Sequence, residues 1–123
     1  MGLDRRRNAE EILYTESPKS MIKKATRLLD RRHHHVYVVF LRNPNGDGKA
    51  GYYVGMTGLT PEQRFENHKN GIKAASVVKK YGERLVPKLY EHLNPMTYGA
   101  AKVMEVELAE ELRKRGFVVF GGH

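Results

Sequence analysis

The spacing of apolar and polar residues predicts two adjacent strands in the first half of the chain. Residues 36–41 form an almost unbroken apolar run of β-branched and aromatic side chains, which is typical of a central strand. A second extended run covers residues 51–55, after a stretch rich in glycine and asparagine at 43–48. Because turn-forming residues separate the two runs, the pattern predicts a β-hairpin.

Helices and one more strand are predicted downstream. Residues 60–63, Thr-Pro-Glu-Gln, have the form of a capping box, so a helix should begin near Thr60 and end at the Lys-Asn-Gly sequence of 69–71. Further helices are expected over 74–81 and 97–115. Residues 84–90 look extended, but Pro87 limits them to a sheet edge, and 117–120 predicts a last short strand. The elements indicate an α+β protein.

The longest predicted helix carries a carboxylate in an unexpected place. At about 100° per residue, one apolar stripe on this helix contains four side chains: Ala101, Met104, Leu108 and Leu112. Glu105 falls inside that stripe, whereas Glu107 falls outside it. A carboxylate facing a core must be paired, protonated or bound to a metal, because an isolated buried charge is costly. The alternative is a glutamate at the margin of the stripe that reaches water.

Composition narrows the class of function. The 123 residues suffice for one core, and the absence of cysteine excludes disulfides and thiolate metal sites, which favours hard cations. The 22 basic residues exceed the 14 acidic ones, and the excess lies within residues 1–90. Such a charge favours nucleic acid as partner over an anionic membrane. With no apolar run able to cross a bilayer and no secretory leader, we expect a cytoplasmic protein.

Residues 1–33 are predicted to form a basic, helical N-terminal extension, separate from a domain over 34–123. The extension contains the run Arg5–Arg7 and an apolar stripe that suits a helix reaching about Arg31. Its last residue begins the run His33–His35, which invites a metal role. Three consecutive residues of an extended chain point alternately to opposite faces, however, and do not easily share one ion.

From residue 34 onward the chain resembles the GIY-YIG nuclease family. His35-Val36-Tyr37 is similar to the Gly-Ile-Tyr motif of the family, and Tyr53-Val54-Gly55 is similar to its Tyr-Ile-Gly motif. Four further positions match in the family order: Arg64, His68, Gly71 and Glu105. Two departures are the histidine in place of the first glycine and the long hairpin loop.

The resemblance implies a small three-stranded antiparallel sheet flanked by helices. It also implies a metal-dependent endonuclease that acts on nucleic acid, and we expect DNA as its substrate more than RNA. It implies that Glu105 holds one Mg²⁺ or Mn²⁺ and that Arg64 pairs with a phosphate oxygen. Tyr37 would be the general base, with Tyr53 as a hydrogen-bonding partner and His68 orienting the network. The sequence permits these three to exchange roles, and it leaves Glu107 open as the metal ligand.

Other interpretations of the same residues stay open. The basic side chains after the first helix are candidates for nucleic-acid contacts: Lys69, Lys73, Lys79 and Lys80. A nucleic-acid-binding module without catalysis would use the same charges, and a protein-interaction domain would use none of them. Since no separate sequence-reading module is evident, targeting by a partner protein is a further expectation.

Overall fold

The structure, a computed structural model, describes residues 31–123, of which Arg32–His123 form one compact unit. The run Arg5–Arg7 and the helix expected to reach Arg31 lie outside the described residues. In chain order the strands and α-helices are β1 (His35–Leu41), β2 (Gly51–Thr57), α3 (Pro61–Lys69), α4 (Ser76–Tyr81), β3 (Gly82–Leu85), α5 (Tyr98–Lys114) and β4 (Val118–Gly121). Two short 3₁₀ turns, η1 (Pro87–Leu89) and η2 (Glu91–Leu93), connect β3 to α5. Within residues 31–123, no helix has the length and apolarity to span a membrane.

The sheet has four strands in the order β3-β1-β2-β4. The predicted hairpin is confirmed, because β1 and β2 pair antiparallel from His35–Thr57 to Leu41–Gly51. The prediction of a three-stranded antiparallel sheet is wrong: β3 pairs with β1 as a further strand, and β4 pairs parallel with β2. Between β2 and β4 the chain passes through α3, α4 and α5, so that β4 runs in the same direction as β2. Two parallel neighbouring strands need a long crossover connection of this kind.

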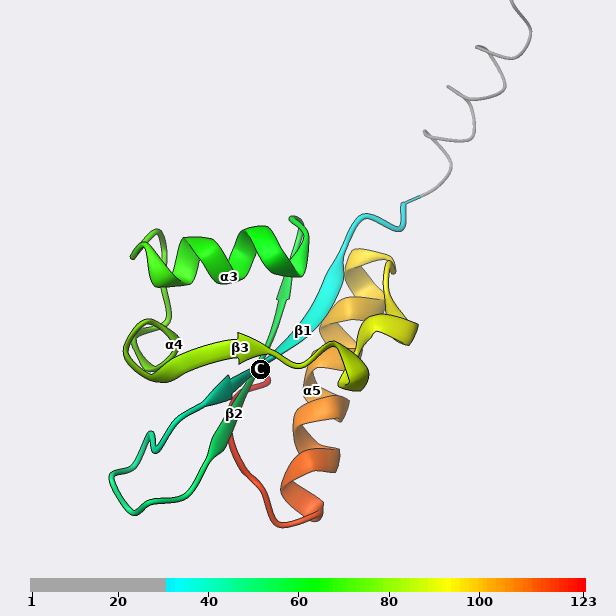
Figure 1. Cartoon of the computed structure of the whole chain (residues 1–123). Helices are drawn as coiled ribbons and strands as arrows, with labels where there is room; N and C mark the ends of the chain where they lie inside the picture. Colours follow the sequence, from blue (N-terminus) through cyan, green and yellow to red (C-terminus); the bar gives the residue numbers. More distant parts are fainter. Residues whose placement is uncertain (1–30) are drawn as a thin grey trace, which may run out of the picture. The chain divides into compact units, whose positions relative to one another are not determined.

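The helices lie on both sides of the central strands (Figure 1). α3 and α4 lie on one side and α5 on the other. Side chains alternate along β1, so Tyr37, Val39 and Leu41 point to the α3 side, whereas Val36, Val38 and Phe40 point to the other. All of these except Phe40 are at most 1% exposed. The core therefore continues through both faces of β1, as its apolar sequence predicts.

The helix boundaries follow local chemistry. Thr60 Oγ1 accepts a hydrogen bond from the N–H of Gln63, and the Gln63 side chain accepts one from the N–H of Thr60, which completes the predicted capping box of α3. Thr97 caps α5 in the same way through the N–H of Ala100. On α5 the buried residues include Ala101, Leu112 and Glu105, so the predicted position of Glu105 on the inward stripe is confirmed.

Candidate functional site

Tyr37 and Tyr53 come from neighbouring strands and lie on the same face of the sheet, with their ring centroids 6.3 Å apart. Gly55 of β2 stands opposite Tyr37. A Cβ at Gly55 would lie 2.6 Å from Tyr37 Oη, because the phenol ring occupies the space where a side chain would be. Packing against the ring of Tyr37 therefore requires a glycine at position 55.

The third ring belongs to His68, in the last turn of α3. Its side chain is 0% exposed, and its Nε2 lies 2.8 Å from Tyr37 Oη. The His68 ring centroid is also 5.7 Å from that of Tyr53, in an edge-to-face arrangement. β1, β2 and α3 thus bring Tyr37, Tyr53 and His68 into one cluster, although the three residues are up to 31 positions apart in the sequence.

The backbone determines which nitrogen of His68 carries the proton. The N–H of Ala75 donates a hydrogen bond of 3.0 Å to Nδ1, so Nδ1 must be the unprotonated acceptor. The proton of the neutral ring then resides on Nε2, which donates to Tyr37 Oη. Burial, with a smaller contribution from Arg64, lowers the pKa of His68 to about 4. His68 is accordingly a neutral hydrogen-bond donor and is not the base that takes the proton of Tyr37.

The guanidinium of Arg64 is also held by backbone groups. Its Nη1 donates to the carbonyl of Ile72 at 3.2 Å and its Nη2 to the carbonyl of Lys73 at 2.7 Å. The loop that presents these carbonyls contains Gly71 and Lys73 at positive φ, +79° and +47°. Glycine tolerates this conformation, but it is uncommon for lysine. The turn after α3 therefore has a definite role, which is to position Arg64 beside the tyrosines.

Burial raises the pKa of both tyrosines. For Tyr37 the pKa lies far above its ordinary value; Tyr53 adds to the increase, whereas the charge and hydrogen bonding of Arg64 oppose it. For Tyr53 burial is again the largest cause, and Glu105 raises the pKa further. Both phenols are therefore protonated at neutral pH, and Arg64 is a group that makes ionisation of Tyr37 easier.

Glu105 approaches the same cluster from α5. Its side chain is 8% exposed, and burial raises its pKa, while an interaction with His123 acts in the opposite direction. The Glu105 charge acts on both Tyr37 and Tyr53. Glu107, by contrast, is exposed and lines a separate apolar surface pocket with Val103 and Val106. The five residues inferred from the sequence therefore converge, and Glu107 lies apart from them.

A divalent cation fits this donor set only with help from other ligands. Within residues 31–123, no group of three or more acidic, histidine or cysteine side chains could hold a metal. The carboxylate of Glu105 has no lysine or arginine ion pair in this part of the chain. Mg²⁺ commonly binds through one or two carboxylates together with waters and substrate phosphates. Glu105 therefore suits a single hard cation that shares its coordination with a phosphate.

The four lysines inferred as nucleic-acid contacts have different surroundings. Lys69 Nζ donates to the carbonyls of Lys79 and Gly82, at 3.1 and 2.8 Å, and so joins the end of α3 to the end of α4. Lys79 packs its side chain along Gly71. Lys73 and Lys80 are exposed. Lys69 therefore has a structural role, and a contact of any of the four with nucleic acid stays a prediction.

Sequence reasoning missed two kinds of residue: those that hold site side chains through backbone groups, and one whose side-chain amide takes the place of a neighbouring strand. The N–H of Ala75 and the carbonyls of Ile72 and Lys73 carry no side-chain pattern that would identify them. Asn94 replaces a strand partner. Its amide pairs with the N–H and the carbonyl of Val36, at 2.9 and 2.8 Å, and holds the outer edge of β1 next to Tyr37.

Comparisons with known proteins identify no relative. No protein-family model, no curated protein and no solved structure matches the chain. The resemblance to GIY-YIG nucleases therefore rests on the motif residues of the sequence alone.

Proposed function

We propose that this protein is a metal-dependent endonuclease of the GIY-YIG type that hydrolyses phosphodiester bonds in nucleic acid. The observation that carries the proposal is the convergence of Tyr37, Tyr53, Arg64, His68 and Glu105 from four separate elements. One buried and one half-buried tyrosine, a positioned guanidinium, and a carboxylate without a lysine or arginine ion pair among residues 31–123 form a set suited to attack on a phosphate. The basic charge of the chain agrees with a polyanionic substrate. We infer DNA as the substrate, from the resemblance alone.

Tyr37 is assigned as the general base for the attacking water. Because His68 Nε2–H donates to Tyr37 Oη, the phenolate form receives a hydrogen bond that stabilises it. Arg64 adds its positive charge, and its fixed position suits a non-bridging phosphate oxygen. Tyr53 is the more accessible phenol and can donate to phosphate or water. The proposal thereby gives distinct roles to the residues whose roles the sequence left exchangeable.

Glu105 would hold Mg²⁺ or Mn²⁺, whose charge neutralises the scissile phosphate and the leaving oxygen. Glu105 itself contributes a carboxylate already removed from solvent, so binding a cation would relieve the cost of burying its charge.

Cleavage assays test the proposal directly. Labelled duplex, branched and single-stranded DNA and the corresponding RNAs are incubated with Mg²⁺ or Mn²⁺, and in parallel with EDTA. We expect metal-dependent cleavage that Arg64→Ala reduces by about a hundred- to a thousandfold, because one positioned donor to a developing charge has about that effect. Arg115→Ala is the matched control, since Arg115 is exposed and pairs only with Glu111 among charged side chains of residues 31–123. Absence of cleavage on every substrate would refute the proposal.

The raised pKa of Tyr37 favours a second candidate, a module that binds nucleic acid without cutting it. A phenol that stays protonated at neutral pH is a poor base. The two candidates separate in the same assay, because binding alone survives chelation and leaves the substrate intact.

A further inference from the structure

A row of side chains crosses the sheet on the face opposite Tyr37 and Tyr53. The strand register places four residues side by side on β3, β1, β2 and β4: Arg84, Phe40, Tyr52 and Val119. One row further into the sheet, Val38 and Val54 are fully buried. The burial of this face therefore ends at the row, and Phe40 belongs neither to the buried core cluster nor to the described side chains packed against it.

The aromatic rings of the row form a continuous chain of edge-to-face contacts. The ring centroid of Phe40 lies 5.9 Å from that of Tyr52, and Tyr52 lies 5.5 Å from Phe117, just after α5. Phe117 is 48% exposed, which is unusual for a phenylalanine. One exposed ring, Phe117, thus adjoins two half-buried rings, Phe40 and Tyr52, and we call these three rings together with Arg84 the aromatic row.

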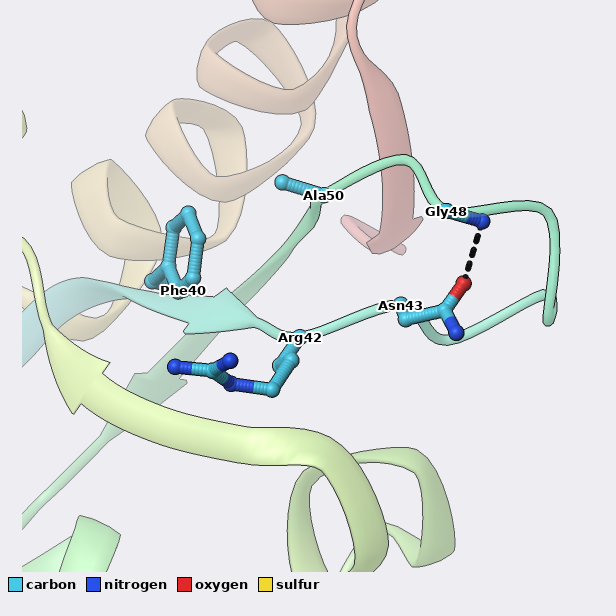
Figure 2. Close-up of a pocket in the computed structure, with 5 residues that line it drawn as sticks. All are labelled: Phe40, Arg42, Asn43, Gly48 and Ala50. Carbon is cyan, nitrogen blue, oxygen red and sulfur yellow. Dashed lines mark hydrogen bonds between the residues drawn. The ribbon is translucent and has the colours of Figure 1, made fainter.

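A pocket of about 460 Å³ adjoins one end of the aromatic row. Figure 2 shows its five lining residues, Phe40, Arg42, Asn43, Gly48 and Ala50, which come from the end of β1 and the hairpin loop. Asn43 Oδ1 accepts a hydrogen bond from the N–H of Gly48, which gives the loop a defined shape beside Phe40. The volume lies within the range of small-molecule pockets, roughly 300–1,000 Å³, and so has room for one planar base.

An arginine lies at each end of the aromatic row, and one of them, Arg113, is ion-paired with Glu110 at 3.7 Å. The guanidinium of Arg84 lies 4.9 Å from the centroid of the Phe40 ring. At the other end, Arg113 donates to the carbonyls of Val119 and Gly121 on β4. Aromatic faces between cationic groups are what proteins use to bind single strands, because every base has a face that stacks and every linkage has a phosphate.

We propose that the aromatic row and its pocket bind unpaired bases of a single-stranded nucleic acid. This inference rests on the proposed function, which supplies nucleic acid as the ligand. It restricts the substrate further, to a nucleic acid that has a single-stranded segment. The row lies on the face of the strands opposite Tyr37 and Tyr53. A nucleic acid that reaches both faces must turn around the sheet, which a flexible single strand does readily and a duplex, with a persistence length of about 150 base pairs, does not.

The absence of tryptophan from the chain allows a direct optical test. Phe117→Trp places one indole in the aromatic row, and its fluorescence is followed as a thymidine 12-mer is added in EDTA at low salt. We expect saturable quenching that weakens as salt rises, and much weaker quenching by a 12-base-pair duplex. Tyr98→Trp is the matched control: Tyr98 is 55% exposed on α5 with Lys102 over its ring, yet it lies outside the row. Its indole should stay unquenched.

Substitutions within the row then locate the effect. In the Phe117→Trp background, Phe40→Leu should weaken binding of the 12-mer by about tenfold or more, the effect of losing one stacked base, and leave duplex binding unchanged. Circular dichroism melting verifies that the variant is folded, and Arg84→Gln, exposed and without a core contact, provides a second test if Phe40→Leu does not fold.

Equal quenching at both indoles, or no quenching at Phe117→Trp, would overturn the inference. The proposed function is refuted by a different result. Cleavage without quenching would refute only the binding role of the aromatic row, and quenching without cleavage would refute only the nuclease activity.

Discussion

The candidate site has two halves that are held in different ways. On the α3 side, the backbone fixes His68 through the N–H of Ala75 and fixes Arg64 through two loop carbonyls. On the α5 side, Glu105 is buried and interacts with His123, but it has no lysine or arginine ion pair among residues 31–123. The difference teaches that the protein's own backbone organises the α3 half, whereas the α5 half lacks such hydrogen bonds; under the proposed function, a metal ion would complete it.

The largest expected effect tests the α5 half. Glu105→Gln should abolish metal-dependent cleavage, because the amide keeps the shape but loses the charge that holds the cation. It should also remove any rise in the melting temperature on adding Mn²⁺, since a ligand stabilises only the protein that binds it. Glu107→Gln is the matched control on the same helix. A Mn²⁺-dependent rise that persists in Glu105→Gln and disappears in Glu107→Gln would reassign the metal ligand.

The next effect tests how tightly the α3 half is packed. A Cβ in Gly55→Ala would collide with Tyr37, whose ring lies between the sheet and α3. We expect cleavage to fall by about a hundredfold, as for displacement of a reacting group by about 1 Å, and the free energy of unfolding to fall by about 1–3 kcal/mol from overpacking. Gly99→Ala, at a position with open space around it, is the control. Unchanged kinetics in Gly55→Ala would show that Tyr37 is not the base.

The pH dependence of cleavage tests whether Tyr37 is the general base. A base must be deprotonated to act, and burial raises the pKa of Tyr37 above its ordinary value of 10.0. The phenolate fraction therefore grows about tenfold per pH unit throughout the neutral range, so kcat/KM should rise with that slope from pH 7 to about 9 without a plateau. No acid limb near the usual histidine range is expected, because the pKa of His68 is about 4. A plateau that begins near pH 6.5 would indicate histidine as the base instead.

The smallest expected effect concerns one proton. Ala75→Pro removes the N–H that fixes His68, at a residue whose φ of −74° already suits proline. The pKa of His68 should rise, and Nδ1-protonated imidazole should appear in ¹⁵N NMR spectra. Cleavage should fall by about tenfold, because the hydrogen bond from His68 Nε2–H to Tyr37, the proposed general base, weakens. Ala75→Gly retains the N–H and should leave the spectra unchanged. Finding Nδ1 protonated in the unsubstituted protein would contradict the assigned tautomer.

The elements themselves follow from local chemistry. The capping box at Thr60 begins α3, the apolar run 36–41 forms a strand paired on both edges, and the stripe of α5 buries Glu105. Each depends on residues within a few positions of one another. The parallel pairing of β4 with β2 was not predicted, because a short strand has the same two-residue alternation whichever direction its partner runs.

By itself, the sequence determined which side chains are available for chemistry and which face of each element carries them. Only the tertiary structure decided how those side chains are held: that His68 is fully buried, that its proton lies on Nε2, and that two loop carbonyls hold the guanidinium of Arg64 on α3. The physical reason is that the deciding partners are backbone N–H and carbonyl groups. Every residue except proline carries both, so their use becomes visible only when distant segments are brought together.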